Sequence, residues 1–139
     1  MKFKRRIARE AVLVALYQVD IGDIFPKDAL DSSISELGIE EEDVIRFAKE
    51  LFFGVIDRMD EIDAHIQSLS KKWELFRMSY IDRNILRIAV YEILFNDDAP
   101  YKVAINEAVE LAKLYGDDKS PKFINGILAS VVKENNIVE

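Results

Sequence analysis

Cysteine is absent from the sequence, which excludes a disulfide framework and any metal site built on thiolates. Histidine occurs once, at His65, so a zinc site with two histidine ligands is also excluded. His65 is more typical of a surface or packed position than of a general base. No segment has the pattern of a nucleophile elbow, a dinucleotide-binding loop or a metal-ligand cluster. We therefore expect no catalytic residue, no bound metal and no cofactor.

Long hydrophobic runs are also missing. No stretch approaches the roughly 18 apolar residues that a membrane-spanning helix needs, and the basic N-terminus precedes no apolar segment of signal-peptide type. We expect a cytoplasmic protein without membrane contact. The length of 139 residues is that of one domain. Such a chain buries roughly two thirds of its unfolded surface, so residues 1–139 can form a core without cross-links.

Apolar residues recur at spacings of three and four along most of the chain, and no strand pattern is present. This periodicity predicts an all-α fold with helices over residues 4–20, 27–37, 80–95, 102–115 and 121–134, a short helix around 71–77, and a segment to residue 69 that is either one helix or two joined near 57–60. The helix over 80–95 is apolar around most of its circumference, which predicts a central position. Ser79 and Asp82 have the spacing of a capping box at its start. Ser120 is the predicted N-cap of the last helix, with Pro121 as its first residue.

Positive charge is concentrated at the N-terminus. The net charge is −7, yet residues 1–9 hold five cations and no acid, so the remaining residues carry −12. Lys2, Arg5, Arg6 and Arg9 have the spacing that places side chains on one helix face. Cations at a helix N-terminus cost about 0.3–1 kcal/mol each, because the helix dipole is positive there. Stability alone would favour acids, so we interpret these cations as a phosphate-binding face rather than only a solvated one.

A tight turn over residues 116–120 leads into the last helix, whose free N–H groups suit an anion. Lys119 and Lys122 add positive charge, although the second glycine and the lysine–hydroxyl ending of a P-loop are missing. Phe123 lies about 100° before Ile124 around the helix, at the edge of its apolar stripe. An aromatic ring beside lysines suits base stacking, and a peripheral core position is the alternative.

Several blocks of sequence together are similar to one known family. They are RRIAREA at 5–11, LYQ at 16–18, DRNILRIAVYE at 82–92, PYKVAINEA at 100–108, ELAK at 110–113 and KFINGIL at 122–128. In this order, over nearly the whole chain, they resemble the NusB family of transcription antitermination factors. The two C-terminal blocks are highly specific, whereas the arginine block alone would not be.

The resemblance implies about seven helices in two small packed bundles, forming a single NusB-like RNA-binding domain over residues 1–139. It also implies binding of boxA-type single-stranded RNA together with the small-subunit ribosomal protein that acts as NusE. That complex would join other Nus factors on RNA polymerase and support ribosomal RNA transcription.

The resemblance also carries over to individual residues. It places the RNA surface on the first helix and on the turn into the last, so the candidate RNA-binding residues are Lys2, Arg5, Arg6, Arg9, Lys119, Lys122 and Phe123. It places the protein partner on the central helices, with Asp82 and Arg83 as candidates. The chain departs from the family pattern at Lys119, where an acid is common, and at Pro121.

Two other interpretations remain open. The chain is also similar to the NusB-like domain of RNA cytosine methyltransferases, although no cofactor-binding αβ domain follows Glu139. From a different class, it could be a homo-oligomeric helical scaffold whose basic face is occluded in a homodimer.

Overall fold

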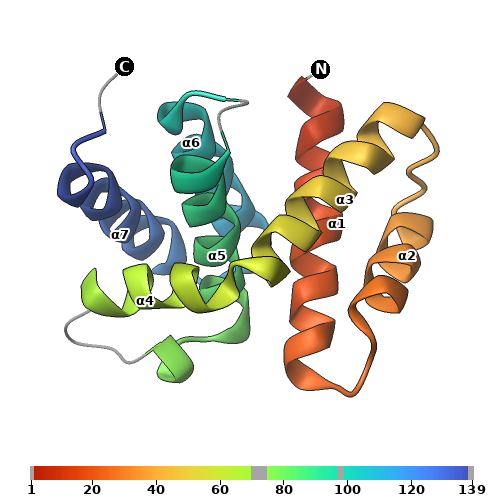
Figure 1. Ribbon diagram of the computed structural model, residues 1–139, viewed down its shortest axis with the longest axis horizontal. Helices are drawn as coiled ribbons and strands as arrows, with labels where there is room; N and C mark the ends of the chain where they lie inside the picture. The colour runs from red at the N-terminus through yellow and green to blue at the C-terminus, as the bar shows by residue number, and fades with distance from the viewer. Residues whose placement is uncertain (1, 70–74, 97–98, 138–139) are drawn as a thin grey trace. The chain divides into compact units, whose positions relative to one another are not determined.

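The computed structural model describes residues 2–69, 75–96 and 99–137, with residues 2, 3 and 76 described only in their backbone. Within these ranges the chain forms seven α-helices and one 3-10 turn and contains no strand (Figure 1). The elements are α1 (Lys2–Ile21), α2 (Pro26–Glu36), α3 (Glu42–Asp57), α4 (Met59–Leu69), η1 (Leu75–Arg77), α5 (Tyr80–Phe95), α6 (Tyr101–Tyr115) and α7 (Ser120–Glu134). The predicted all-α class is confirmed. None of the described helices is long and apolar enough to cross a membrane.

The helices group into two compact units, Met1–Asp57 and Arg58–Glu139. The boundary lies at the break between α3 and α4, so the segment ending at residue 69 is two helices rather than one. The predicted short helix around residues 71–77 is described only as the 3-10 turn η1. Trp73 lies outside the described residues.

In the first unit, α1 packs against both α2 and α3 (Figure 1). The buried face of α1 is rich in alanine, and small side chains allow neighbouring helices to approach closely. It consists of Ala8, Ala11, Val12, Leu13, Ala15 and Leu16. The hydroxyl of Ser33, on α2, donates a 2.5 Å hydrogen bond to the carbonyl of Ala11. A buried polar side chain in this interface is therefore hydrogen-bonded.

In the second unit, α5 contacts α4, α6 and α7. Its apolar residues from Ile85 to Val90 are almost fully buried, which confirms the predicted central position within this unit. The backbone N–H of Asp82 donates to Ser79 Oγ over 3.0 Å. Ser79 is therefore the N-cap of α5, as the sequence predicted.

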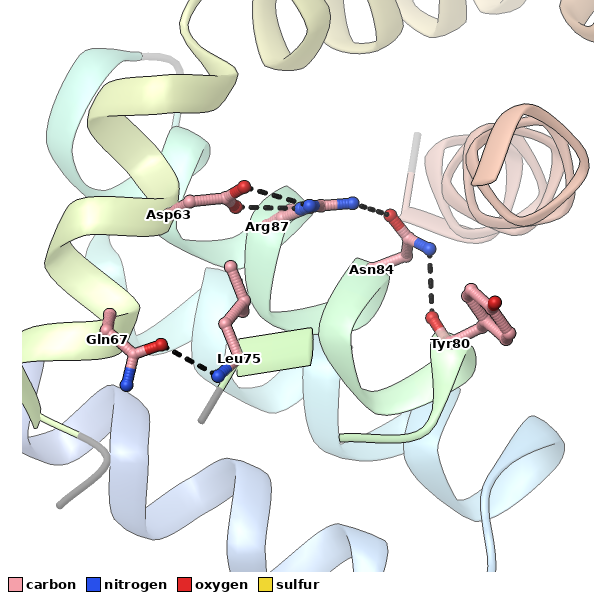
Figure 2. A network of polar contacts seen from close by, with 6 residues as sticks. All are labelled: Asp63, Gln67, Leu75, Tyr80, Asn84 and Arg87. Carbon is pink, nitrogen blue, oxygen red and sulfur yellow. Dashed lines mark hydrogen bonds and ion pairs between the residues drawn. The ribbon is translucent and has the colours of Figure 1, made fainter. Parts of the chain in front are cut away.

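A buried ion pair joins α4 to α5 (Figure 2). Arg87 Nε and Nη2 donate to the two carboxylate oxygens of Asp63, each over 2.8 Å. Nη1 of Arg87 donates to Asn84 Oδ1 over 3.1 Å, and Asn84 Nδ2 donates to the carbonyl of Tyr80 over 2.9 Å. The bidentate geometry is the strongest form of this contact. It holds α4 in one register along α5.

A second contact ties η1 to the same pair of helices. The backbone N–H of Leu75 donates to Gln67 Oε1, on α4, over 2.8 Å (Figure 2). Leu75 is itself buried. The chain immediately before Ser79 is therefore positioned by α4, which is positioned by Arg87.

Removal of the Asp63 carboxylate tests this arrangement. Asp63→Ala would remove the bidentate partner of the buried guanidinium of Arg87, and removal of one partner of a buried ion pair typically costs about 3–5 kcal/mol of folding stability. The exposed pair of Lys27 and Asp31, 2.8 Å apart, provides the control. Asp31→Ala should change the free energy of unfolding by less than about 1 kcal/mol. Urea unfolding followed by circular dichroism measures both, and equal decreases would contradict a special role for the buried pair.

Candidate nucleic-acid interface

The first turn of α1 contains no acidic residue. Because α1 begins at Lys2, the four N-terminal candidates for RNA binding all lie on this helix: Lys2, Arg5, Arg6 and Arg9. Arg5 and Arg6 are half-buried and reach the surface. Lys4 is paired with the exposed carboxylate of Glu41. The side chain of Lys2 lies outside the described residues.

Arg9 does not have the exposed position that the sequence predicted. Its side chain is only 3% exposed, and its guanidinium lies 5.3 Å from the centre of the Phe47 ring. The guanidinium of Arg5 lies over the same ring at 4.6 Å. These cation–π contacts attach α1 to α3. Arg5 and Arg6 are therefore the arginines of this helix that a phosphate can reach in this conformation.

The turn before α7 is closed by the carboxylate of Asp117. Asp117 Oδ1 accepts the backbone N–H of Lys119 over 2.8 Å and that of Ser120 over 3.1 Å. The backbone N–H of Asp117 donates in return to Ser120 Oγ over 3.0 Å. The prediction of Ser120 as N-cap is wrong, since Lys119 occupies that position and Ser120 is the first residue of α7. The capping is done by the side chain of Asp117.

Gly116 is required in this turn for steric reasons. A Cβ atom at this position would lie 2.5 Å from Ser120 Oγ and 2.6 Å from Ser120 Cβ. Ser120 is buried, with 2% of its surface exposed, and cannot move aside. The absence of a side chain at Gly116 therefore lets the first turn of α7 approach the end of α6.

The phase of α7 agrees with the sequence pattern. Its buried apolar residues are the four predicted ones, Ile124, Ile127, Leu128 and Val131. Phe123 is half-buried at the edge of this stripe, and Lys119 and Lys122 are exposed. An aromatic ring thus lies beside two accessible lysines at the N-terminus of a helix.

A hollow of about 390 Å³ lies beside Phe123, where α5 and α7 begin. Its lining residues are Arg77, Met78, Ser79, Asp82, Asp117, Lys119 and Phe123. The structure therefore places Asp82, a candidate for the protein partner, in the same hollow as Lys119 and Phe123, candidates for RNA. Sequence reasoning missed Arg77 and Met78 and treated Asp117 only as a turn residue. The sequence indicated only that each group of lining residues lies at the start of a predicted helix, residues 77–82 at the helix over 80–95 and residues 117–123 at the helix over 121–134.

The other partner candidate, Arg83, is only 4% exposed, and its guanidinium lies 4.8 Å from the centre of the Tyr80 ring. Asp82 is half-buried. Burial raises the pKa of Asp82, and the charge of Asp117 raises it further. Hydrogen bonds from Ser120 and Ser79 act in the opposite direction but do not cancel the effect. The ionised form of Asp82 is therefore less favourable here than in water.

The raised pKa of Asp82 predicts a pH-dependent cost. The folded state holds the proton more tightly than the unfolded state, so wild-type stability falls as pH rises through the interval from the ordinary value of 3.8 to the raised value. Asp82→Asn does not titrate and should escape this decrease. Urea unfolding at a series of pH values should show the stability of the variant increasing relative to that of the wild type as the pH rises above 3.8. A difference that does not change with pH would contradict the assignment.

No group of three or more potential metal-binding side chains occurs among the residues that the structure describes. The accessible chemistry consists instead of arginines on α1, in the first unit, and of the hollow with its lysines and aromatic ring, in the second. Cations contact phosphate oxygens, and a half-exposed ring can stack on a base. This combination is typical of nucleic-acid binding rather than of catalysis.

Comparison with known proteins agrees with this chemistry. A sequence model of the NusB family matches residues 6–133. The transcription antitermination protein NusB of Bacillus pumilus is 45% identical over 128 residues, covering 92% of this chain and 94% of that protein. Among solved structures, T. maritima NusB has a TM-score of 0.87 and 39% identity, covering 94% of this chain and 91% of that one. A chain from the crystal structure of antitermination factors NusB and NusE in complex with dsRNA has a TM-score of 0.87 and 30% identity, covering 96% of this chain and 99% of that one. The chain therefore belongs to the NusB family of non-enzymatic transcription antitermination factors.

Proposed function

We propose that this protein binds boxA-type single-stranded RNA together with the small-subunit ribosomal protein that acts as NusE. In this role it joins other Nus factors on RNA polymerase, in the cytoplasm, and supports ribosomal RNA transcription. A similar chain has been crystallised as NusB with NusE and dsRNA, which supports both classes of partner.

The observation that carries the RNA proposal is the acid-free first turn of α1. Arg5 and Arg6 stand at the positive end of the helix dipole, where cations are unfavourable for folding. Neither is fully buried, so both can reach a ligand. Phosphate groups at this end of the helix would be attracted by the dipole and by the arginines together.

The second unit supports the same proposal. Lys119 and Lys122 are exposed beside the half-buried ring of Phe123. Phosphate contacts and base stacking together are the usual basis of single-strand binding. We assign these three residues to RNA binding by the second unit, and Arg5 and Arg6 to RNA binding by the first.

Binding of a basic ribosomal protein is supported by charge. Outside residues 1–9 the chain carries a net charge of −12. Opposite net charges favour encounter between two proteins. Arg83 is too deeply buried to contribute much contact area itself, so the partner surface we propose consists of exposed acidic residues rather than of this guanidinium.

A homodimer that occludes the basic face is the alternative. Light scattering on the purified protein, with and without a boxA-type RNA, separates the two proposals. A monomer that binds RNA supports the function proposed here. A stable dimer that excludes RNA supports the scaffold.

The arginines of α1 should determine the salt dependence of RNA binding. Arg5→Ala/Arg6→Ala should lower the log–log salt slope by about 0.7 for each phosphate of a single-stranded RNA that the variant no longer neutralises. Lys27→Ala/Lys49→Ala removes the same charge from exposed positions elsewhere in the first unit and should leave the slope unchanged. Fluorescence anisotropy over a salt series measures both variants. An unchanged slope in the arginine variant would remove the basis for the proposal.

Phe123 should contribute to RNA affinity more than to folding. Phe123→Ala should weaken RNA binding by about 1–3 kcal/mol, the value of one base stack. Its thermal midpoint should stay close to that of the wild type, because Phe123 is only half-buried. Truncation of a fully buried phenylalanine would instead cost about 3–5 kcal/mol of folding stability. Phe25→Ala is the matched control, since Phe25 is 78% exposed and lies in the other unit. A large decrease in stability with normal RNA binding would make Phe123 a core residue instead.

A further inference from the structure

One carboxylate in the hollow is not used by the RNA-binding contacts assigned above. Asp82 Oδ1 is buried and has no hydrogen-bond partner among the residues that the structure describes. The neighbouring Asp117 differs, because its Oδ1 already accepts the N–H groups of Lys119 and Ser120. A buried acceptor without a donor is costly, and most such groups in proteins are satisfied. Asp82 is therefore the group in this hollow that a ligand would satisfy.

We propose that the hollow receives a single RNA base with an exocyclic amino group and that the carboxylate of Asp82 accepts a hydrogen bond from this amino group. The proposal rests on the RNA-binding function above and adds a preference for base identity at one position. Asp82 is thus a specificity-determining residue on the RNA side rather than a contact for the protein partner.

The lining of the hollow fits a nucleotide. Phe123 provides a ring against which a base can stack. The cationic residues Arg77 and Lys119 are exposed at the same hollow and can reach a phosphate. Its volume of about 390 Å³ lies within the range of sites that hold small ligands, roughly 300–1,000 Å³.

The chemistry of Asp82 sets the preference. An ionised carboxylate only accepts hydrogen bonds, so it needs a donor on the ligand. Cytosine presents an amino group where uracil presents a carbonyl oxygen, and carboxylates pair with this amino group in known recognition. The terminal torsion of an aspartate side chain is broad. A small rotation of the carboxyl group can therefore turn the buried oxygen toward the incoming amino group.

A lysine or arginine of a protein partner could also donate to Asp82. The lining contains two cations, Arg77 and Lys119, and two carboxylates, Asp82 and Asp117, so it has no excess of negative charge that would attract a further cation. A neutral amino group needs no such excess, the ring of Phe123 offers a base a stacking surface, and the two cations can contact the phosphates of the strand. The lining thus favours a nucleotide over a cationic side chain.

The test uses the full-length protein and two ten-nucleotide RNAs that differ in one functional group. One is oligocytidine, and the other carries pyrimidin-2-one ribosides, which are cytidines without the amino group. Wild type should bind oligocytidine about tenfold more tightly, the scale of one hydrogen bond to a charged group. Asp82→Ala should reduce this ratio to about one.

Three variants serve as controls. Asp118→Ala removes the same charge from an exposed residue that does not line the hollow, and it should keep the tenfold ratio. Phe123→Ala should weaken binding of both RNAs and keep the ratio. Asp82→Asn retains an acceptor of weaker, neutral type and should give an intermediate ratio, so it decides the matter if the alanine variant does not fold.

Each outcome bears on the proposal. A ratio that stays near ten in either folded Asp82 variant overturns it. Equal binding of both RNAs by wild type also overturns it, while the RNA-binding function stands. Weaker affinity for the ribosomal-protein partner in Asp82→Ala, with the base ratio unchanged, assigns the residue to the protein partner instead. Failure of wild type to bind either RNA overturns this inference and the proposed function together.

Discussion

The second unit depends on one buried ion pair, between Arg87 of α5 and Asp63 of α4. The almost fully buried guanidinium of Arg87 donates hydrogen bonds to both carboxylate oxygens of Asp63 and to Asn84 Oδ1, which offset the cost of burying its charge (Figure 2). Because two of these acceptors belong to α4, the pair fixes α4 against α5. Through Gln67 and Leu75 it also positions the segment that leads into Ser79 and the hollow.

The same side-chain types serve different purposes at different depths. The guanidinium groups of Arg5 and Arg9 both lie over the ring of Phe47. Arg9 is buried and serves the packing of α1 against α3, whereas Arg5 retains access to solvent and can also contact a ligand. Asp117 and Asp82 line one hollow, yet Asp117 is occupied in capping α7, whereas Asp82 keeps an unsatisfied oxygen. The number of partners that the fold already supplies separates structural groups from groups available to a ligand.

Local sequence patterns predicted much of the candidate site. The phase that sets Phe123 beside the stripe containing Ile124 follows from helical spacing, which acts over a few residues. The helix α1 begins at Lys2, two residues before the predicted start at residue 4. The burial of Arg9 could not be predicted in this way, because Phe47 belongs to another helix. The cap of α7 was assigned to Ser120 rather than to Asp117, since both residues are good caps and only backbone geometry distinguishes them.

The sequence by itself determined the helices, their apolar faces and the concentration of positive charge at the N-terminus. These features depend on residues a few positions apart, and the chain encodes them directly. Only the tertiary structure decided that residues 77–82 and 117–123 share one hollow, and that Asp82 lies beside Phe123. Their meeting depends on how α5, α6 and α7 pack, with Gly116 allowing Ser120 close to the end of α6. Packing of this kind brings together residues that are far apart in the chain, so the spacing of residues within one helix cannot predict it.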